Sequence, residues 1–252
     1  GVDTVFHLVG GEWKGSSEDL HAIEVEGSLN LSLAVKNSKV KRIYYLSHIG
    51  ADRASAFPVL KAKGIAEEHI RKSGVEYSIL RTSLIYGPDD QFTTPLAKLI
   101  AGTPFVFPLP SEGEMTLQPI WVEDLITCLV WGLDNEQINN RTIELGGPEQ
   151  ISLYEIVEMV KAKIGRRKFM LKVEPSILRV IGTVLENFFP GLPLSVYWVD
   201  YLAMSKTCPL DSIPITFGLM PARMKDHLDH LVERPWERMF WRDFFRRSSS
   251  AS

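Results

Sequence analysis

Four β-rich runs alternate with segments of helical periodicity, and this alternation constrains the fold more than any other feature of the chain. The β-rich runs cover residues 2–9, 41–50, 75–81 and 141–147. Apolar residues recur at helical spacing over residues 18–37, 59–70, 123–134 and 152–164. Strands that alternate with helices predict a parallel sheet, because a parallel connection must cross back over one face of the sheet. We therefore expect an α/β fold with a parallel, doubly wound sheet.

Local signals agree with this assignment. Gly74 follows the second helical segment at the place where a C′ glycine is expected, and Ser152 and Glu155 have the spacing of a capping box. The run at 41–50 is almost continuously apolar, which is typical of a strand covered by helices on both faces. Pro and Gly interrupt residues 89–122, where we expect an insertion near a cleft.

Charge and composition exclude several classes of protein. The formal net charge is −3, from 28 basic and 31 acidic residues, whereas a nucleic-acid-binding protein normally carries a basic excess. Cys128 and Cys208 are too few for a disulfide framework or a zinc cluster, which favours a reducing compartment and hence the cytoplasm. No apolar run reaches the roughly 18 residues that a membrane-spanning helix needs.

Several runs together carry a family resemblance. LKAKGIAEEHIRKSGVEYSILRTSLIYGPDD at 60–90 resembles the lysine helix, the next strand and the YGP turn of extended and atypical short-chain dehydrogenase/reductase proteins. Three other runs resemble that family's fourth strand, its fifth strand and the segment that leads from substrate contacts into a helix; they are GVDTVFHLVGGEW (1–13), YYLSHIGAD (44–52) and LQPIWVEDLITCLVWGL (117–133). Within the family, LVGGEW and LSHIGA are most similar to NmrA-like proteins and to the nucleotide-binding accessory subunit of respiratory complex I. The resemblance implies a Rossmann-type domain that binds NAD or NADP, followed by a small, mostly helical lobe.

The resemblance also implies a phosphate-binding half that this chain lacks. In the family, a first strand, a GxxGxxG turn and a helix bind the pyrophosphate of the cofactor at the helix N-terminus. No such motif occurs in this chain, and the glycines at 10–11, 87 and 146–147 do not have its spacing. Because the chain begins directly with a strand, we expect an N-terminally truncated domain that starts at the family's fourth strand. The choice between NAD and NADP, made after the second strand, stays open.

By this resemblance, the catalytic positions of the chain are altered. Lys63 matches the family lysine that binds the nicotinamide ribose and lowers the pKa of a catalytic tyrosine. That tyrosine normally lies four residues earlier, where this chain has Val59, and Glu24 in IEVEGS replaces an asparagine. Ser47 keeps the place of the active-site hydroxyl. His48, beside it, is either a replacement proton donor or, as we favour, a hydrogen-bonded histidine at a strand end.

The implied cofactor site runs along the carboxyl ends of the strands, where ligands of open α/β sheets bind. The residues expected to contact the cofactor are Val9, Gly10, Ser47, Lys63, Thr82, Ser83 and Ile85. The catalytic candidates are Lys63, Ser47 and His48. Without the phenol, we expect weak or absent tyrosine-dependent hydride transfer.

Three other histidines do not predict a metal site. His7 lies within a strand, and we expect a hydrogen-bonded core histidine there. His227 and His230 have aspartates nearby, but we expect them on an exposed charged face of a polar helix rather than around a metal ion.

The last third of the chain combines apolar and basic residues. Residues 177–188 predict an amphipathic helix, and an aromatic segment follows to residue 204. Within 236–247, three arginines recur every four residues among Trp and Phe side chains; they are Arg238, Arg242 and Arg246. Core packing is the preferred explanation for 177–204. For 236–247, core packing and docking on a membrane or protein partner are equally supported.

These expectations define three regions and three functional alternatives. We expect an NAD(P)-binding domain over 1–165, a mostly helical substrate or docking lobe over 166–247 and a disordered tail over 248–252. The favoured function is an accessory or sensing protein that binds a dinucleotide and an unidentified small molecule, in the cytoplasm or at a membrane periphery. The alternatives are an active NAD(P)-dependent oxidoreductase or epimerase/dehydratase that uses His48 or another group as proton donor, and an interaction protein that binds no nucleotide.

Overall fold

A parallel sheet of four strands forms the centre of the molecule. The computed structural model describes residues 1–11, 17–110, 115–174, 176–178, 180, 182–183 and 204–245. The strands lie in the order β1-β2-β3-β8, and their bounds are Thr4–His7, Arg42–His48, Glu76–Thr82 and Arg141–Leu145. These are the four strands predicted from the sequence. Because all four are parallel, their carboxyl ends lie along one edge of the sheet.

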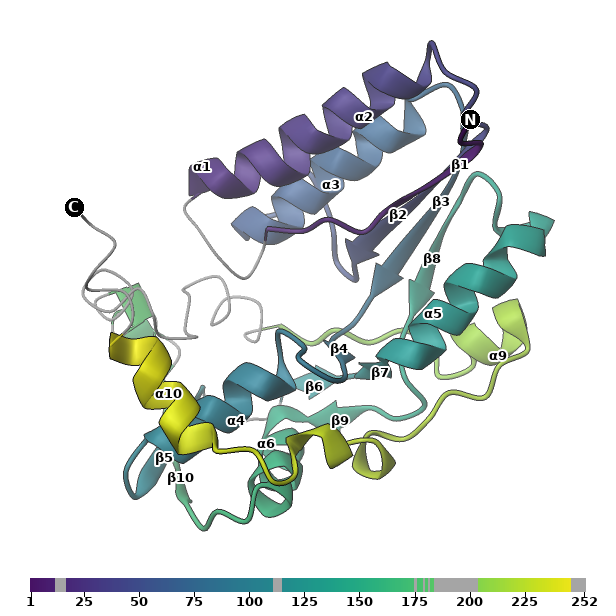
Figure 1. The fold of residues 1–252 in the computed structure, drawn as a ribbon. Coiled ribbons are helices and arrows are strands. Elements are labelled where there is room, and N and C mark those ends of the chain that lie inside the picture. Colours follow the sequence, from purple (N-terminus) through teal and green to yellow (C-terminus); the bar gives the residue numbers. More distant parts are fainter. Residues whose placement is uncertain are drawn as a thin grey trace.

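Two long helical segments cover one face of the sheet (Figure 1). The first comprises α1 (Ser17–Leu20), a π-helical segment (His21–Glu26) and α2 (Gly27–Val35). The second is α3 (Pro58–Arg71). The core between these helices and the sheet contains Val35, Ile43, Tyr45, Ala66, Ile70 and Ile79.

Helices α5 (Val122–Trp131) and α9 (Ser212–Phe217) cover the opposite face. Tyr44 and Leu80 point to this side, whereas their neighbours Tyr45 and Ile79 point to the α3 side. This alternation follows from the two-residue period of a strand. Strand β2 therefore contributes apolar side chains to the cores on both faces of the sheet. This explains why its sequence is almost continuously hydrophobic. The α/β Rossmann-type fold predicted from the sequence is confirmed.

A second hydrophobic core lies beyond the sheet. Helices α4 (Thr93–Gly102), α6 (Leu153–Lys163) and α10 (Trp236–Phe245) surround it, next to a parallel pair of β5 (Val106–Pro110) and β10 (Phe169–Val173). Two short ladders connect this core with the sheet: β4 (Ile85–Tyr86) with β7 (Ile120–Trp121), and β6 (Thr116–Leu117) with β9 (Ile151–Ser152). Residues from before and after position 165 meet in this core, and the predicted domain boundary there stays a prediction.

Residues 89–122, where we expect an insertion near a cleft, contain regular structure that the sequence did not predict. The segment contains the regular helix α4, and Leu96, Ala97 and Ile100 of that helix are buried in the second core. The sequence obscured the helix because it is only ten residues long and carries Pro95. Proline is tolerated there because the first turn of a helix needs no backbone N–H.

Part of the C-terminal third lies outside the described residues. This includes most of the predicted helix at 177–188, nearly all of the aromatic segment to 204, and the tail at 248–252. The described positions within that predicted helix, 177–178, 180 and 182–183, are helical. Within the described ranges, no helix has the length and apolar character needed to cross a bilayer.

Candidate functional site

The residues predicted for the site converge on the carboxyl edge of the sheet. They follow or end three neighbouring strands and are, in chain order, Val9, Gly10, Ser47, His48, Thr82 and Ser83. The register pairs His48 directly with Thr82. Lys63 reaches this edge from α3, and Ile85 begins β4. Ligands of open α/β sheets bind at such an edge.

Lys63 forms a buried ion pair with Glu24. The Lys63 Nζ lies 3.1 Å from Glu24 Oε2 and donates a hydrogen bond to the Leu46 carbonyl oxygen at 3.3 Å. The side chains of Lys63 and Glu24 are 4% and 0% exposed. The Nζ also lies 5.4 Å from the centroid of the Tyr45 ring. A carboxylate of the protein therefore balances the charge of this amine.

The Glu24 carboxylate also binds two other parts of the edge. The Gly11 N–H donates a hydrogen bond to Oε1 at 3.0 Å, and the Tyr45 hydroxyl donates one to Oε2 at 3.2 Å. A Cβ on residue 11 would lie 3.0 Å from Ile23 Cδ1, so glycine allows the close approach of this turn to the helical segment. One buried carboxylate thus connects the turn after β1, strand β2 and helix α3.

His7 differs from its expected role as a hydrogen-bonded core histidine. It ends β1, is half-buried and stacks on the Tyr45 ring with centroids 5.5 Å apart. Its Nε2 is buried and makes no hydrogen bond to any residue that the structure describes. Burial, and then the positive charge of Lys63, lower the pKa of His7. The neutral ring is therefore the favoured form beside this lysine.

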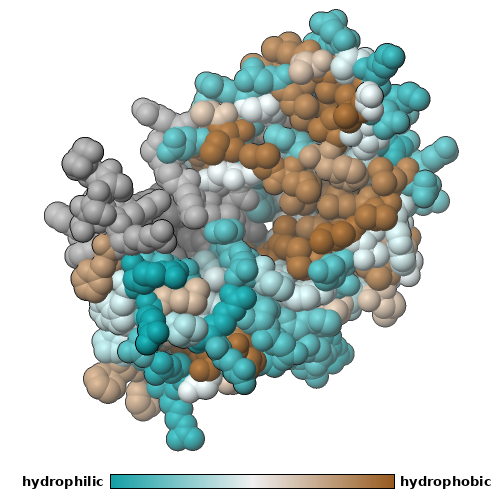
Figure 2. All heavy atoms as spheres, viewed as in Figure 1, coloured by the Kyte–Doolittle hydropathy of each residue, from teal (hydrophilic) through white to brown (hydrophobic). Residues whose placement is uncertain are grey.

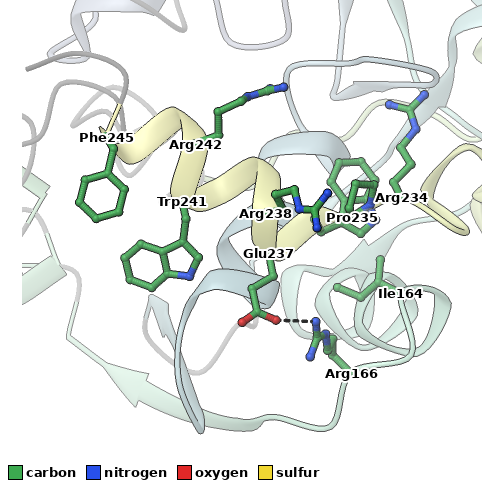
Figure 3. Close-up of a pocket in the computed structure, with 10 residues that line it drawn as sticks. Ile164, Arg166, Arg234, Pro235, Glu237, Arg238, Trp241, Arg242 and Phe245 are labelled. Atoms are coloured by element: carbon green, nitrogen blue, oxygen red, sulfur yellow. Dashed lines mark hydrogen bonds and ion pairs between the residues drawn. The ribbon is translucent and has the colours of Figure 1, made fainter. Parts of the chain in front are cut away.

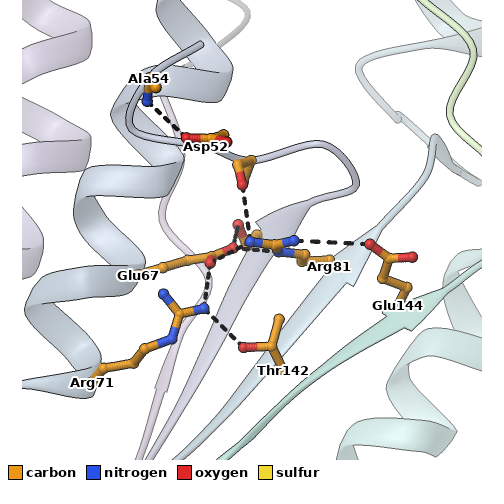
Figure 4. Close-up of polar contacts among 9 residues, drawn as sticks. Asp52, Ala54, Glu67, Arg71, Arg81, Thr142 and Glu144 are labelled. Carbon is orange, nitrogen blue, oxygen red and sulfur yellow. Dashed lines mark hydrogen bonds and ion pairs between the residues drawn. The ribbon is translucent and has the colours of Figure 1, made fainter.

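The Ser47 hydroxyl belongs to a second buried network, centred on Glu67. Figure 4 shows Glu67 between Arg71 and Arg81. The Ser47 hydroxyl donates a hydrogen bond to Glu67 Oε1 at 2.7 Å. Arg81 binds both oxygens of Glu67, with Nε–Oε1 and Nη2–Oε2 distances of 2.8 Å, and Arg71 Nη2 lies 2.7 Å from Oε2. Burial opposes the charged form of Glu67, but the hydrogen bonds from Arg81 and Ser47 outweigh it and lower the pKa of Glu67. The hydroxyl expected at the active site is therefore part of the sheet–helix interface.

Thr82 and Ser83 also use their hydroxyls within the protein. The Thr82 hydroxyl donates to the Ser47 carbonyl oxygen at 3.3 Å. The Ser83 hydroxyl donates to the Lys206 carbonyl oxygen at 2.9 Å and accepts from the Gln118 N–H at 3.2 Å. Because both hydroxyls are bonded within the protein, we expect a ligand at this edge to meet the backbone of Thr82 and Ser83 rather than their hydroxyl groups.

Val59, at the position expected for the family tyrosine, has apolar surroundings in the folded protein. Val59 is buried in a small cluster with Leu20, Val25 and Ala62. Tyr45 on β2 is the phenol that lies beside Lys63, and sequence reasoning did not single it out. The two-residue period of β2 could have found it, because this period places Tyr45 on the side of the sheet that α3 covers. His48, the last residue of β2, is 7% exposed.

The C-terminal histidines correct another expectation. They do not lie on a polar helix but on two 3₁₀ turns, Met224–Asp226 and Asp229–Leu231, or next to them. His227 packs on the Trp121 ring at 4.9 Å, and His230 Nε2 lies 2.9 Å from Thr93 Oγ1. Within the described part of the chain, no three His, Cys, Asp or Glu side chains form a metal-binding group.

Parallel strands, helices on both faces and a polar carboxyl edge define an α/β protein of the Rossmann type. No family model matches the chain. The solved structure of MoeE5 in complex with UDP-glucose and NAD has the same fold. Its TM-score is 0.69 at 16% identity, and the match covers 94% of this chain and 80% of that one.

In particular, the chain resembles atypical short-chain dehydrogenase/reductase proteins related to the complex I accessory subunit, as predicted from the sequence. The NADH dehydrogenase (ubiquinone) 1 alpha subcomplex subunit 9 of Mus musculus is 27% identical over 203 residues, covering 79% of this chain and 48% of that protein. The Photosystem II assembly factor Ycf39 of Synechocystis is 22% identical over 208 residues, covering 80% and 62%. The chain spans about half the length of the first of these relatives.

Proposed function

We propose that the protein carrying this chain binds NAD(P)(H) and acts as an accessory or sensing protein with little or no tyrosine-dependent hydride transfer. The observation that carries this proposal is the buried ion pair of Lys63 and Glu24, together with Val59 at the tyrosine position. The relatives support the accessory role, since one is named as a subunit of a larger dehydrogenase and another as an assembly factor.

The electrostatics of the edge favour binding over proton transfer. A lysine assists a phenol by stabilising the phenolate with its positive charge. Here the carboxylate of Glu24 lies 3.1 Å from the amine and cancels that charge. Deprotonation of Tyr45 would place a phenolate 3.2 Å from the same carboxylate, and repulsion between like charges opposes this.

The cofactor that we propose is a nicotinamide dinucleotide. When bound, it would supply hydride transfer, which also requires a substrate and a proton donor. Lys63 would hold the ribose end, and the backbone of 82–85 would line the nicotinamide end. Val9 and Gly10 are exposed after β1, so the backbone of that turn is accessible to a ligand. The choice between NAD and NADP remains open within this proposal.

Titration of the full-length protein with NADH and NADPH, followed by the fluorescence of the reduced nicotinamide, tests the proposal. We expect saturable binding without oxidation of the cofactor in the presence of a panel of carbonyl substrates. The double variant Glu24→Gln/Lys63→Met removes both buried charges and should weaken binding. Lys72→Met, at an exposed position just after the same helix, is the matched control and should bind as the wild type does.

Two results would contradict this proposal. Absence of binding to either nucleotide would favour an interaction protein without nucleotide. Steady oxidation of the reduced cofactor, lost in the double variant and retained in Lys72→Met, would show that Lys63 takes part in catalysis.

An active NAD(P)-dependent oxidoreductase or epimerase is the second candidate, because His48 ends β2 at the same edge and is almost fully buried. The similar structure of MoeE5 contains UDP-glucose and NAD, so nucleotide sugars belong in the substrate panel. The deciding measurement compares the pH–rate profile of the wild type with that of His48→Ala. Turnover that does not depend on His48 removes this candidate's proton donor.

We further propose a protein partner, since the named relatives belong to or assemble larger complexes. The relative from Mus musculus is mitochondrial. A location in the cytoplasm or at the periphery of a membrane stays a prediction for this chain.

A further inference from the structure

A cavity of about 1030 Å³ opens beside α10, and none of its lining residues belongs to the four-stranded sheet (Figure 3). Its lining combines guanidinium groups with aromatic rings. These side chains are Arg166, Arg234, Arg238, Arg242, Trp241 and Phe245. The function proposed above uses none of them.

Positive charge prevails around this cavity. Ion pairs connect Arg166 with Glu237, Arg234 with Asp89, and both Arg242 and Lys98 with Asp243. Arg238 forms no ion pair with any acidic residue that the structure describes. Four arginines and one carboxylate, that of Glu237, line the cavity, in a chain whose formal net charge is −3.

Helix α10 has one buried and one exposed face. Trp236 and Phe240 are buried, and the Phe240 ring occupies the space that a Cβ on Gly102 of α4 would need. Trp241 and Phe245 are 43% and 67% exposed, and their rings stack with centroids 6.0 Å apart. Figure 3 shows Trp241 and Phe245 on one side of α10, while the side chains of Arg238 and Arg242 extend from the same helix in other directions. Trp236 and Phe240 pack α10 against the second core, whereas Trp241 and Phe245 lie outside that core.

A second exposed aromatic group lies at the same end of the molecule. Phe105 precedes β5, and Phe169 and Leu171 alternate along β10; all three are largely exposed. Figure 1 places the β5–β10 pair next to α4 and α10. Figure 2 shows pale-brown residues beside strongly hydrophilic ones at the lower left. Exposed phenylalanine rings therefore lie on β10 and just before β5 as well as on α10.

We propose that the exposed face of α10 docks on a bilayer that contains anionic phospholipid, with lipid phosphates bound by the arginines around the cavity. Aromatic rings settle at the level of the lipid headgroups, and a helix with aromatic residues beside a cationic face lies in that interface. One guanidinium group can donate two parallel hydrogen bonds to the oxygens of one phosphate. An acidic protein would complement the charge alone, whereas an anionic bilayer complements both the arginines and the exposed rings.

Co-sedimentation of the full-length protein with lipid vesicles tests this proposal. We expect binding to vesicles in which phosphatidylglycerol replaces part of the phosphatidylcholine, weaker binding at high salt, and no binding to phosphatidylcholine alone. The variant Arg238→Glu/Arg242→Glu should bind at least about 25-fold more weakly, since each basic residue near an anionic surface contributes roughly five-fold. Trp241→Ser/Phe245→Ser should also lose binding, while the charge of the protein stays unchanged.

A matched control carries the same charge reversal elsewhere. Arg53→Glu/Lys72→Glu changes two exposed basic residues that both pair with Glu68 of α3, and this variant should bind vesicles as the wild type does. All four substituted side chains of α10 are exposed, so we expect the thermal unfolding midpoint and the binding of NAD(P)H to stay unchanged in these variants. The test is therefore independent of the proposed cofactor site.

Three results would overturn the proposal. Equal binding to both kinds of vesicle would remove the role of the arginines. Equal loss in the α10 and α3 charge reversals would show a general charge effect. Competition by soluble glycerol phosphate, at a concentration equal to that of the lipid phosphate, would show a site for a free anion instead of a bilayer surface.

Discussion

A buried lysine is costly unless an opposite charge lies beside it, and Glu24 meets this need for Lys63. An amide at position 24 could orient the lysine but could not balance its charge, whereas the carboxylate does both. Relative to the family pattern that the sequence resembles, Glu24 and Val59 both remove a condition under which a lysine activates a phenol, and both side chains are buried.

Removing only the carboxylate of this pair should be costly. We expect Glu24→Gln to lower the free energy of unfolding by about 3–5 kcal/mol, because it removes the carboxylate that balances the buried charge of Lys63. The double variant Glu24→Gln/Lys63→Met should recover most of the loss. Urea unfolding at neutral pH measures both. The control is Glu68→Gln, which breaks two surface ion pairs, with Lys72 and with Arg53, and should change stability little. A single variant as stable as the double variant would show that the pair does not balance the charge.

At the scale of elements, glycines decide how closely helices approach their neighbours. A Cβ on Gly64 of α3 would lie 2.3 Å from the backbone nitrogen of Arg53, so only glycine lets α3 pack on the loop after β2. This contact holds Lys63, the preceding residue, deep at the edge of the sheet. Gly102 has the same role between α4 and the Phe240 ring of α10.

The same substitution should have opposite effects at two helical glycines. Gly102→Ala should destabilise the protein by about 1–3 kcal/mol, because its Cβ would meet the Phe240 ring at 2.2 Å and force α10 outward. Gly27→Ala should stabilise it by about 0.5–1 kcal/mol, because the nearest atom lies at 3.7 Å and alanine favours the helix. Thermal unfolding of both variants tests this. A neutral Gly102→Ala would show that α10 is free to shift on α4.

At the scale of the whole molecule, the Glu67 network connects the sheet with its helical layer. Ser47 belongs to β2, Glu67 and Arg71 to α3, Arg81 to β3 and Thr142 to β8. Arg71 Nη2 donates a hydrogen bond to Thr142 Oγ1 at 2.9 Å, so the network spans three adjacent strands. Loss of the Glu67 carboxylate therefore removes hydrogen bonds that connect β2, β3 and α3 at the same time.

Acid should weaken this connection in a defined range of pH. The pKa of Glu67 lies below its ordinary value of 4.5 in the folded protein, so its stabilising contribution is complete above about pH 4.5 and is lost as the pH falls through the folded pKa. Glu67→Gln should cost about 3 kcal/mol at neutral pH. Urea unfolding between pH 7 and pH 3 should show the wild type approaching Glu67→Gln below about pH 4.5. A constant difference over the whole range would exclude a role for the charge of Glu67.

Periodicity predicted the four strands and their neighbouring helices because each signal lies within one element. The capping box at Ser152 and Glu155 is present as predicted, since both partners belong to one helical turn. Helix α4 escaped prediction because it is short and its stability comes from packing in the second core. The turns beside His227 and His230 escaped prediction for a related reason, because contacts with Trp121 and Thr93 are distant in sequence.

The sequence by itself determined a parallel sheet, the edge at which Ser47, Lys63 and Thr82 gather, and the absence of a phenol at position 59. Only the tertiary structure decided which groups bind one another there: Glu24 and Tyr45 with Lys63, and Glu67 with Ser47 and Arg81. The physical reason is that hydrophobic periodicity acts over a few neighbouring residues. A buried charge, in contrast, takes its partner from whichever element packs against it, however distant that element is along the chain.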